Sequence, residues 1–545
     1  MNDMMKTVLP KTSFCKSMLV VDLAKDKSYK SWEAKEVLMT LTVIQGIVNR
    51  TEREKIYFIN YPNEHFWNPC PADLQQLETD GFFDVPYTYA ALNHNKKYPA
   101  LSFLVHKYRT YIKGKIICPS LSKEVCDGAI MAAITACGQT DAIPVTVAVE
   151  EYLSQEGFEF DKIEDTRTLT DNIQALEWAL KNYFNSETTK AFIGHHTYTA
   201  FGGDVNDQFP NLYDYYIANK AFVFCLDGNK AHEKEKLKDI LNEKKYPLGV
   251  PIIGLPVDEG KGLKTIEDLG YYLIIANVQN LSCTSGITVQ TEEFQTQPEP
   301  KAYDVDDNDV FVAFYVTDGD SMGFATLFHY DEAKNRIKRN DLPMGWSVNP
   351  LLFDIYPSLM KWKWNLNPNC YEMILDWNDQ TWDGCFRKSN EEVFKKYCAQ
   401  NKYYTEKYGI YTTNYFEGSN EYIKFVCPFL QINGYMGERG SMTTIEQEQD
   451  TIKMTLSGTS GSKDAAAIEF DIKSSVEHCE KGKPAFVLVC VGDGRADYGG
   501  GDYGRKLSDV MEDLKNASDG RTYKFVMPKD LAATWKKWKN KFCEI

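Results

Sequence analysis

One strand-like segment constrains the fold of this chain more than any other feature. Residues Val310–Asp320 read VFVAFYVTDGD, an apolar run that ends in a carboxylate, a glycine and a second carboxylate. A continuous β-branched and aromatic run of this length is typical of a strand buried on both faces, as in a parallel sheet covered by helices. Ligands of such sheets and barrels bind at the carboxyl ends of the strands. Asp318 and Asp320 are therefore candidate site residues, although Asp side chains in a turn also bond nearby backbone amides.

The composition excludes several classes of protein. With 545 residues the chain is too long for one core. The net charge of -16 argues against a nucleic-acid binder, which needs a basic face. A membrane span is not expected, because no run of about 18 apolar residues occurs. The cysteines show no CxxC or zinc-ligand spacing and are expected to be buried thiols. The first residues lack the apolar centre of a signal peptide, so the cytoplasm is expected, or secretion if the natural start differs.

Strands and helices alternate along the first 290 residues, which predicts parallel α/β structure. We expect a first α/β domain over residues 1–160, with strands at Met18–Leu23 and Lys55–Asn60 around a helix at Glu33–Arg50. A second α/β domain is expected over residues 161–290. The polar, acidic and proline-containing stretch 291–309 is expected to be a linker.

The remaining residues, 310–545, again alternate between strands and helices, which predicts a distorted (β/α) barrel-like domain. The strands expected after Val310–Asp320 are Tyr371–Leu375, Gly409–Phe416, Phe425–Ile432, Phe486–Val491 and Tyr523–Val526. Helices are expected at Asn349–Leu366, Asn390–Tyr404 and Arg505–Ser518.

Acidic side chains follow four of these strands. They are Asp318 and Asp320, Asp376 and Asp379, Glu417, and Asp493 in the glycine-rich segment VGDGRADYGGGDYG. If the strands are parallel, these carboxylates meet at one edge of the sheet. Carboxylates that are crowded together cannot all stay ionised, so an acid forms beside a base, which is what glycosidic bond cleavage requires.

Aromatic residues accompany the acids, and sugar rings stack on such side chains. Trp346, Trp377 and Trp382 flank the acidic segments, although the usual role of a single tryptophan is packing. No cofactor is expected. The alternative chemistry is a hard divalent cation held by Asp318 and Asp320, since clustered carboxylates suit such ions.

Several segments resemble the bacterial GxGYxYP family of glycoside hydrolases. Thr42–Arg50, TVIQGIVNR, is similar to the family's LQGLVNR segment, and Asn277–Gly286, NVQNLSCTSG, to its NLSV-SG segment. Tyr315–Pro357 is the strongest match, with YVTDGD and then LPMGWSVNPLLFDIYP. The resemblance implies carbohydrate hydrolysis by a barrel-like C-terminal domain. Its site residues carry over to Asp318, Asp320, Trp346, Asn349 and Asp354.

The name-giving motif of the family is missing from this chain. The motif should follow the strand at Tyr371, but the sequence there reads ILDWNDQTWDGC. The resemblance without this motif implies a divergent member of the family. The leading hypothesis is a hydrolase with Asp318 or Asp320 as nucleophile or base and Asp376 or Glu417 as proton donor. The residues expected to bind the sugar are Trp346, Asn349, Asp354, Trp377, Asp379, Trp382 and Asp493. The alternatives are a catalytically silent carbohydrate-binding protein and a metal-dependent esterase or deacetylase, and the sequence leaves the glycan and the oligomeric state open.

Overall fold

The computed structural model of the chain falls into two compact units. One, the N-terminal unit, consists of Lys6–Val289 together with Leu351–Met360. The other, the barrel unit, consists of Gln290–Pro350 and Lys361–Ile545. The structure describes residues 9–23, 31–59, 84–122, 124–196, 212–243, 246–254, 266, 269–275, 278–294, 297–316, 319, 322, 342–365, 369–376, 391–414, 427–428, 433–440, 443–457, 465–480, 482–491 and 507–543.

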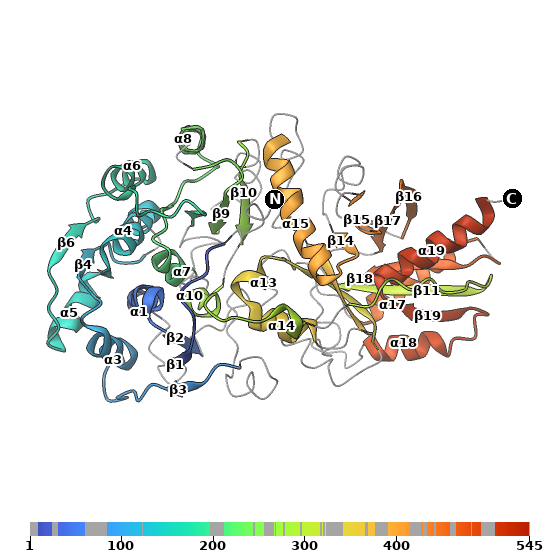
Figure 1. Cartoon of the computed structure of the whole chain (residues 1–545), viewed down its shortest axis with the longest axis horizontal. Coiled ribbons are helices and arrows are strands. Elements are labelled where there is room, and N and C mark those ends of the chain that lie inside the picture. The colour runs from blue at the N-terminus through green and yellow to red at the C-terminus, as the bar shows by residue number, and fades with distance from the viewer. Residues whose placement is uncertain are drawn as a thin grey trace. The chain divides into compact units, whose positions relative to one another are not determined.

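The strands of the N-terminal unit form three small, separate parallel sheets (Figure 1). Their strand orders are β2-β1-β3, β5-β4-β6 and β10-β9-β7-β8. The strands are β1 (Ser17–Asp22), β2 (Glu54–Ile59), β3 (Tyr87–Tyr89), β4 (Gly114–Ile117), β5 (Ala142–Val145), β6 (Lys162–Asp165), β7 (Ile193–His195), β8 (Val223–Phe224), β9 (Pro251–Gly254) and β10 (Tyr272–Ile275). The helices are α1 (Trp32–Thr51), α3 (Pro99–Tyr108), α4 (Asp127–Thr140), α5 (Val147–Gln155), α6 (Asn172–Tyr183), α7 (Tyr213–Ala218), α8 (Ala231–Asn242), α10 (Leu281–Thr284) and α13 (Leu352–Ile355).

The helix α1 is the centre of this unit, and it is buried along most of its length. Ser31 caps its start by accepting a hydrogen bond from the backbone of Ala34 at 3.2 Å. Gly46 lets α7 approach closely, because a Cβ at this position would lie 2.5 Å from the backbone oxygen of Asp214. At its end Arg50 donates to backbone oxygens of α4 and α7, which ties the three helices together.

The barrel unit contains one large sheet whose hydrogen-bonded path returns to its own start. The order is β12-β13-β14-β15-β17-β18-β11-β19, and β12 pairs with β11 as well. The strands are β11 (Asp309–Val316), β12 (Met344–Val348), β13 (Tyr371–Asp376), β14 (Thr412–Asn414), β15 (Gly434–Gly440), β17 (Thr451–Ser457), β18 (Ala485–Cys490) and β19 (Thr522–Val526). All these pairings are parallel, and only the added strand β16 (Ile445–Glu448) runs antiparallel, against β17.

The strand β11 explains why the barrel is distorted. Its first half pairs with β19 and its second half with β12 along the same edge, while β18 occupies the other edge. All of its residues are buried. The α/β class with a distorted barrel-like C-terminal part, expected from the sequence, is thus confirmed.

The last helix, α19 (Pro528–Cys543), packs across the N-terminal ends of the barrel strands. Leu531, Ala532 and Trp535 enter the same core as Phe311 and Phe486, which lie near the starts of β11 and β18. Residues 297–309, which belong to the linker expected at 291–309, run beside this helix: the backbone N–H groups of Lys301 and Tyr303 donate to its side chains. The other helices of the unit are α15 (Glu391–Tyr408), α17 (Ala465–Glu477) and α18 (Leu507–Lys515), with η2 (Thr291–Glu293) and the end of α14 (Pro357–Trp364).

Two expected elements differ from the structure. The helix expected at Asn349–Leu366 is interrupted at Tyr356, because the residue before Pro357 is disfavoured in helical conformation, so α13 and α14 are separate. The strand expected at Phe425–Ile432 is wrong where it can be compared: Cys427 and Pro428 are helical, and β15 begins only at Gly434.

Candidate functional site

Three neighbouring strands of the barrel, β12, β13 and β14, end in or lead directly into polar residues at the same edge of the sheet. The pairing register sets Val316 beside Trp346, Val348 beside Leu375, and Asp376 beside Asn414. Asn349 comes directly after Val348, and Asp376 comes directly after Leu375. Asn349 and Asp376 therefore lie at the same level of the sheet. This edge is the carboxyl end of the parallel strands, where sites in barrel folds are built.

The strand β13 directs Asp376 into the barrel. Side chains alternate along a strand, so Glu372, Ile374 and Asp376 share one face, and Ile374 lies in the barrel core with Ala313 and Tyr315. Asp376 is 3 % exposed. Its Oδ1 accepts a long hydrogen bond of 3.5 Å from Nδ2 of Asn414, the next strand end. The structure thus brings a carboxylate and a carboxamide together at the inner rim.

The DGD turn is fixed to the same rim through its glycine. The backbone N–H of Gly319 donates to Oγ of Ser347 at 2.7 Å, and its oxygen accepts from the backbone N–H of Asn349 at 2.8 Å. A Cβ on Gly319 would lie 1.9 Å from the backbone oxygen of Ser347, so only glycine fits. Asp318 and Asp320 are covalently attached to this anchored glycine, but both lie outside the described residues.

The tryptophan expected to be a sugar platform has a different role. Trp346 is 1 % exposed and stacks on Tyr371, with ring centroids 5.6 Å apart and planes at 14°. Side chains alternate along β12, so Trp346 lies on the opposite face from Gly345 and Ser347. Gly345 packs against Ile374 of the barrel core, and Ser347 bonds to Gly319. Trp346 is therefore a packing residue, and its indole offers no face to a sugar.

The other expected site residues are divided. Asn349 is fully buried at the rim, whereas Asp354 lies on α13 and belongs to the N-terminal unit, so these two are not members of one unit. The remaining candidates lie outside the described residues: Asp318, Asp320, Glu417, Trp377, Asp379, Trp382 and Asp493. Where residues are described, no group of three or more His, Cys, Asp and Glu side chains could hold a metal ion.

A second buried carboxylate, missed by the sequence analysis, lies at the opposite end of β13. Oε2 of Glu372 accepts from the backbone N–H of Lys529 at 2.9 Å, and Oε1 accepts from the hydroxyl of Thr412. Burial raises the pKa of Glu372 to about 7, against the lowering effect of the Lys529 charge. The sequence feature that could have revealed this buried carboxylate is a glutamate inside the otherwise apolar strand YEMILD.

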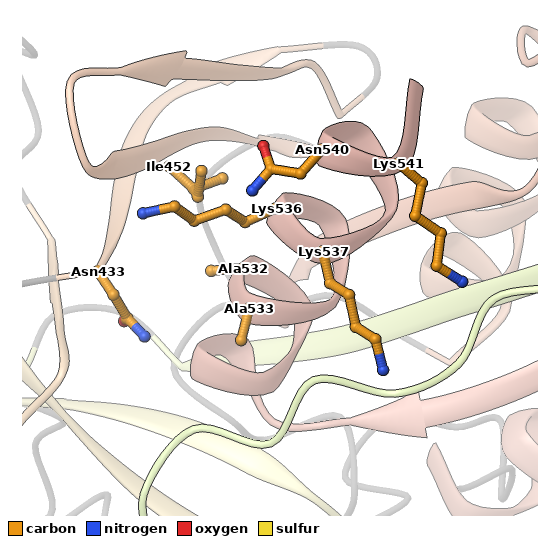
Figure 2. Close-up of a pocket in the computed structure, with 8 residues that line it drawn as sticks. All are labelled: Asn433, Ile452, Ala532, Ala533, Lys536, Lys537, Asn540 and Lys541. Atoms are coloured by element: carbon orange, nitrogen blue, oxygen red, sulfur yellow. The ribbon is translucent and has the colours of Figure 1, made fainter. Parts of the chain in front are cut away.

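A hollow of about 530 Å³ lies at this same N-terminal end of the barrel, between α19 and the starts of β15 and β17 (Figure 2). The lysines that line it diverge rather than converge, as Figure 2 shows. Lys536 pairs with Asp450 at 3.1 Å, and Lys537 pairs with Asp304 at 2.9 Å. The hollow is therefore not part of the carboxylate rim.

Comparison with known proteins matches three parts of the chain to one family. Residues 25–95 match the first GxGYxYP domain, residues 195–286 the third, and residues 308–367 the domain described as "GxGYxYP putative glycoside hydrolase C-terminal domain". The resemblance to the GxGYxYP family is confirmed. The C-terminal match contains Gly319, Ser347 and Asn349, the residues that hold the DGD segment at the barrel edge.

One solved structure shares the fold of this chain. A chain described as a putative hydrolase from Bacteroides thetaiotaomicron VPI-5482 superposes with a TM-score of 0.75 over 97 % of this chain and 96 % of its own, at 16 % sequence identity. The 4-alpha-glucanotransferase from Thermococcus litoralis covers 43 % of this chain and 40 % of its own at 10 % identity, and its TM-score of 0.27 establishes no common fold. No curated protein matches the sequence.

The two segments of the N-terminal unit that resemble the GxGYxYP family have a structural role. Gln45 donates to Oδ1 of Asn280 at 2.7 Å, and Asn49 donates to Oγ of Ser282 at 2.9 Å. Both amides also donate to the backbone oxygen of Ile56. The segments TVIQGIVNR and NVQNLSCTSG are thus joined in one buried hydrogen-bond network. Among the described helices of the chain, none has the length and apolarity that crossing a bilayer needs.

Proposed function

We propose that this chain hydrolyses glycosidic bonds at the carboxyl-end rim of its barrel. The description of the matched C-terminal domain supports a glycoside hydrolase, and the similarity to the Bacteroides chain described as a "putative hydrolase" supports a hydrolase in general. The observation that carries the proposal is the position of Asp376. Its carboxylate is buried, faces the barrel interior and lies at the strand ends where the DGD turn is anchored.

The proposed chemistry divides the work between carboxyl groups. Glycosidic cleavage needs one carboxylic acid to protonate the leaving oxygen and one carboxylate to act as nucleophile or to activate water. We assign the proton donor to Asp376 or Glu417 and the nucleophile or base to Asp318 or Asp320. In this scheme Asn414 fixes the orientation of Asp376, and Ser347 fixes the turn that carries the second carboxylate. A separation of the two reacting carboxyl groups of about 5 Å would give retention, and one of about 6.5–9.5 Å inversion.

The test is Asp376→Asn, compared with Glu372→Gln as a matched control on the same strand and the same face. Turnover is measured on a panel of aryl glycosides and polysaccharides by release of aglycone or reducing sugar, with folding checked by circular dichroism. On a substrate that the natural chain cleaves, Asp376→Asn is expected to lower kcat at least about 100-fold, as loss of acid–base catalysis does, while Glu372→Gln stays within about 3-fold. Equal loss in both variants, or none in Asp376→Asn, would contradict a catalytic role of Asp376.

A second candidate function is binding without catalysis. It is favoured by the sequence ILDWNDQTWDGC, which replaces the GxGYxYP motif after β13. The rim would then hold a carbohydrate but would not cleave it. Binding on a glycan array without release of reducing sugar from the bound glycans would support this function over hydrolysis.

A further inference from the structure

Two segments of the N-terminal unit that are distant in sequence are held together before β1. The backbone N–H of Cys15 donates to the oxygen of Gly286 at 2.8 Å, and the hydroxyl of Thr12 donates to the oxygen of Ser282 at 2.8 Å. Gly286 is so close that a Cβ there would lie 2.5 Å from the backbone oxygen of Ser13. The segment that leads into β1 is thus fixed against α10 in a single register.

This register brings two thiols together beside a buried ammonium group. Cys15 is 2 % exposed and Cys283 is fully buried, and the two thiols are close enough to affect each other's ionisation, while Sγ of Cys15 donates to the backbone oxygen of Ser17 at 3.5 Å. The ammonium group of Lys55 donates to Oγ of Ser13 at 2.7 Å and to the backbone oxygen of Asn49. The charge of Lys55 acts on both thiols.

The pKa values of the two thiols are shifted in opposite directions. The interaction with the Cys283 thiol and the charge of Lys55 lower the pKa of Cys15 against the effect of burial, whereas burial raises the pKa of Cys283. Burial also lowers the pKa of Lys55 to about 8. Thiol–disulfide exchange begins with attack by a thiolate, so Cys15 is the favoured nucleophile and Cys283 the thiol that follows.

The residues on either side of Cys15 are exposed to solvent, although the side chain of Cys15 itself is buried. Its neighbour Phe14 is 53 % exposed, and Lys16 on the other side is exposed too. A small reagent therefore reaches the sulfur once the few hydrogen bonds of residues 12–15 open, without unfolding β1. Local openings of this kind, at the end of a strand, require little free energy compared with global unfolding.

We propose that Cys15 and Cys283 are a redox-active pair that forms an intramolecular disulfide by exchange with a small-molecule disulfide. The thiolate of Cys15 attacks one sulfur of the reagent, breaks its S–S bond and releases one thiolate. The sulfur of Cys283 then attacks Sγ of Cys15 and releases the second thiolate, which takes up the proton of Cys283. Two protein thiols are oxidised, and one reagent disulfide is reduced to two thiols.

The experiment equilibrates the full chain with buffers of rising ratio of oxidised to reduced glutathione. The reaction is stopped with acid, free thiols are alkylated, and disulfide-linked peptides are identified by mass spectrometry. We expect a peptide pair that joins Cys15 to Cys283 in most molecules at the oxidising end, and its disappearance on return to reduced glutathione. The linked form should also unfold at a temperature several degrees higher, because the bond closes a long loop of the unfolded chain.

Two variants and one control decide the outcome. Cys15→Ser and Cys283→Ser should each abolish the linked peptide, while Cys137→Ala, which removes a buried thiol of α4 whose pKa burial raises, should leave it unchanged. Circular dichroism verifies that each variant is folded. The proposal is overturned if the folded natural chain yields no Cys15–Cys283 peptide at any ratio, or if glutathione stays attached to Cys15 while Cys283 remains a free thiol.

Discussion

The two ends of β13 carry buried carboxyl groups on the same face, yet their surroundings differ. Glu372, at the start of the strand, is enclosed by α19 and accepts hydrogen bonds from Lys529 and Thr412. Asp376, at the end, has a long hydrogen bond to Asn414 beside the anchored DGD turn. In barrels the amino end of the strands generally serves stability, and the carboxyl end serves chemistry. The strand β13 thus joins a carboxyl group enclosed by packing to the one that we propose takes part in catalysis.

The strongest test of this contrast alters the turn itself. Gly319→Ala places a Cβ where Ser347 already lies, so the turn must move away from β12. We expect loss of activity to below about 1 % of the natural level and a destabilisation of about 1–3 kcal/mol, typical of overpacking. Turnover on a cleaved glycoside and urea unfolding measure the two effects. Full activity in this variant would mean that the anchored turn is not part of the site.

At the other end, removal of the Glu372 side chain should affect stability and spare catalysis. Glu372→Ala leaves the backbone N–H of Lys529 and the hydroxyl of Thr412 without their acceptor, which costs about 1–3 kcal/mol for each buried group left unsatisfied. Chemical denaturation should show this loss while kcat at permissive temperature changes little. A loss of kcat without a loss of stability would reverse the roles assigned to the two ends.

The titration of Glu372 gives the same contrast a pH dependence. Its folded pKa of about 7 lies above the ordinary value of 4.5, so the folded state holds the proton more tightly than the unfolded state does. The stability that this group contributes is complete below about pH 4.5 and is lost as the pH rises through about 7. Glu372→Gln, which cannot ionise, should flatten this part of the stability profile. An unchanged slope between about pH 5 and 7 would contradict the assignment.

A milder change at the rim is Ser347→Ala. It removes the acceptor of the 2.7 Å hydrogen bond from Gly319 without adding volume. We expect a loss of about 1 kcal/mol in stability and a several-fold fall in kcat, because the turn is held less firmly. Steady-state kinetics should show the effect mainly in kcat, whereas an effect in KM alone would assign Ser347 to binding.

The smallest effect on stability is expected from the exposed ion pair between α19 and Asp450. Lys536→Ala breaks the ion pair with Asp450, an exposed partner, and should change stability by less than about 1 kcal/mol. Thermal unfolding at low and high salt measures it. A large loss would show that the hollow beside α19 contributes more to the barrel than its exposed ion pairs indicate.

The sequence predicted best those elements whose pattern is local. The helix expected at Glu33–Arg50 is α1, Trp32–Thr51, because a serine cap and a long apolar stripe define it. The strand β11 and the position of Asp376 at a strand end also followed from apolar runs that stop at a carboxylate. In each of these cases one segment contains the whole signal.

The sequence failed where the face of a side chain decides its role. The short strand β12 was not recognised, because Gly345 and Ser347 interrupt its apolar pattern. Only the alternation along that strand shows that Ser347 faces the DGD turn and that Trp346 faces the opposite side. Glu372 was missed for a similar reason, since its partners Thr412 and Lys529 are distant in sequence.

The short helix α13 determines how this polypeptide can be dissected. It follows β11 and β12 in the chain, yet it belongs to the N-terminal unit. The backbone oxygen of Ile355 accepts a hydrogen bond from the hydroxyl of Thr284, and the hydroxyl of Tyr356 lies 3.4 Å from that of Tyr57. A fragment that stops at residue 289 lacks these partners, and a fragment that starts at residue 290 carries them with nothing to dock on. No single cleavage point yields two complete halves, so neither half is suited to expression by itself.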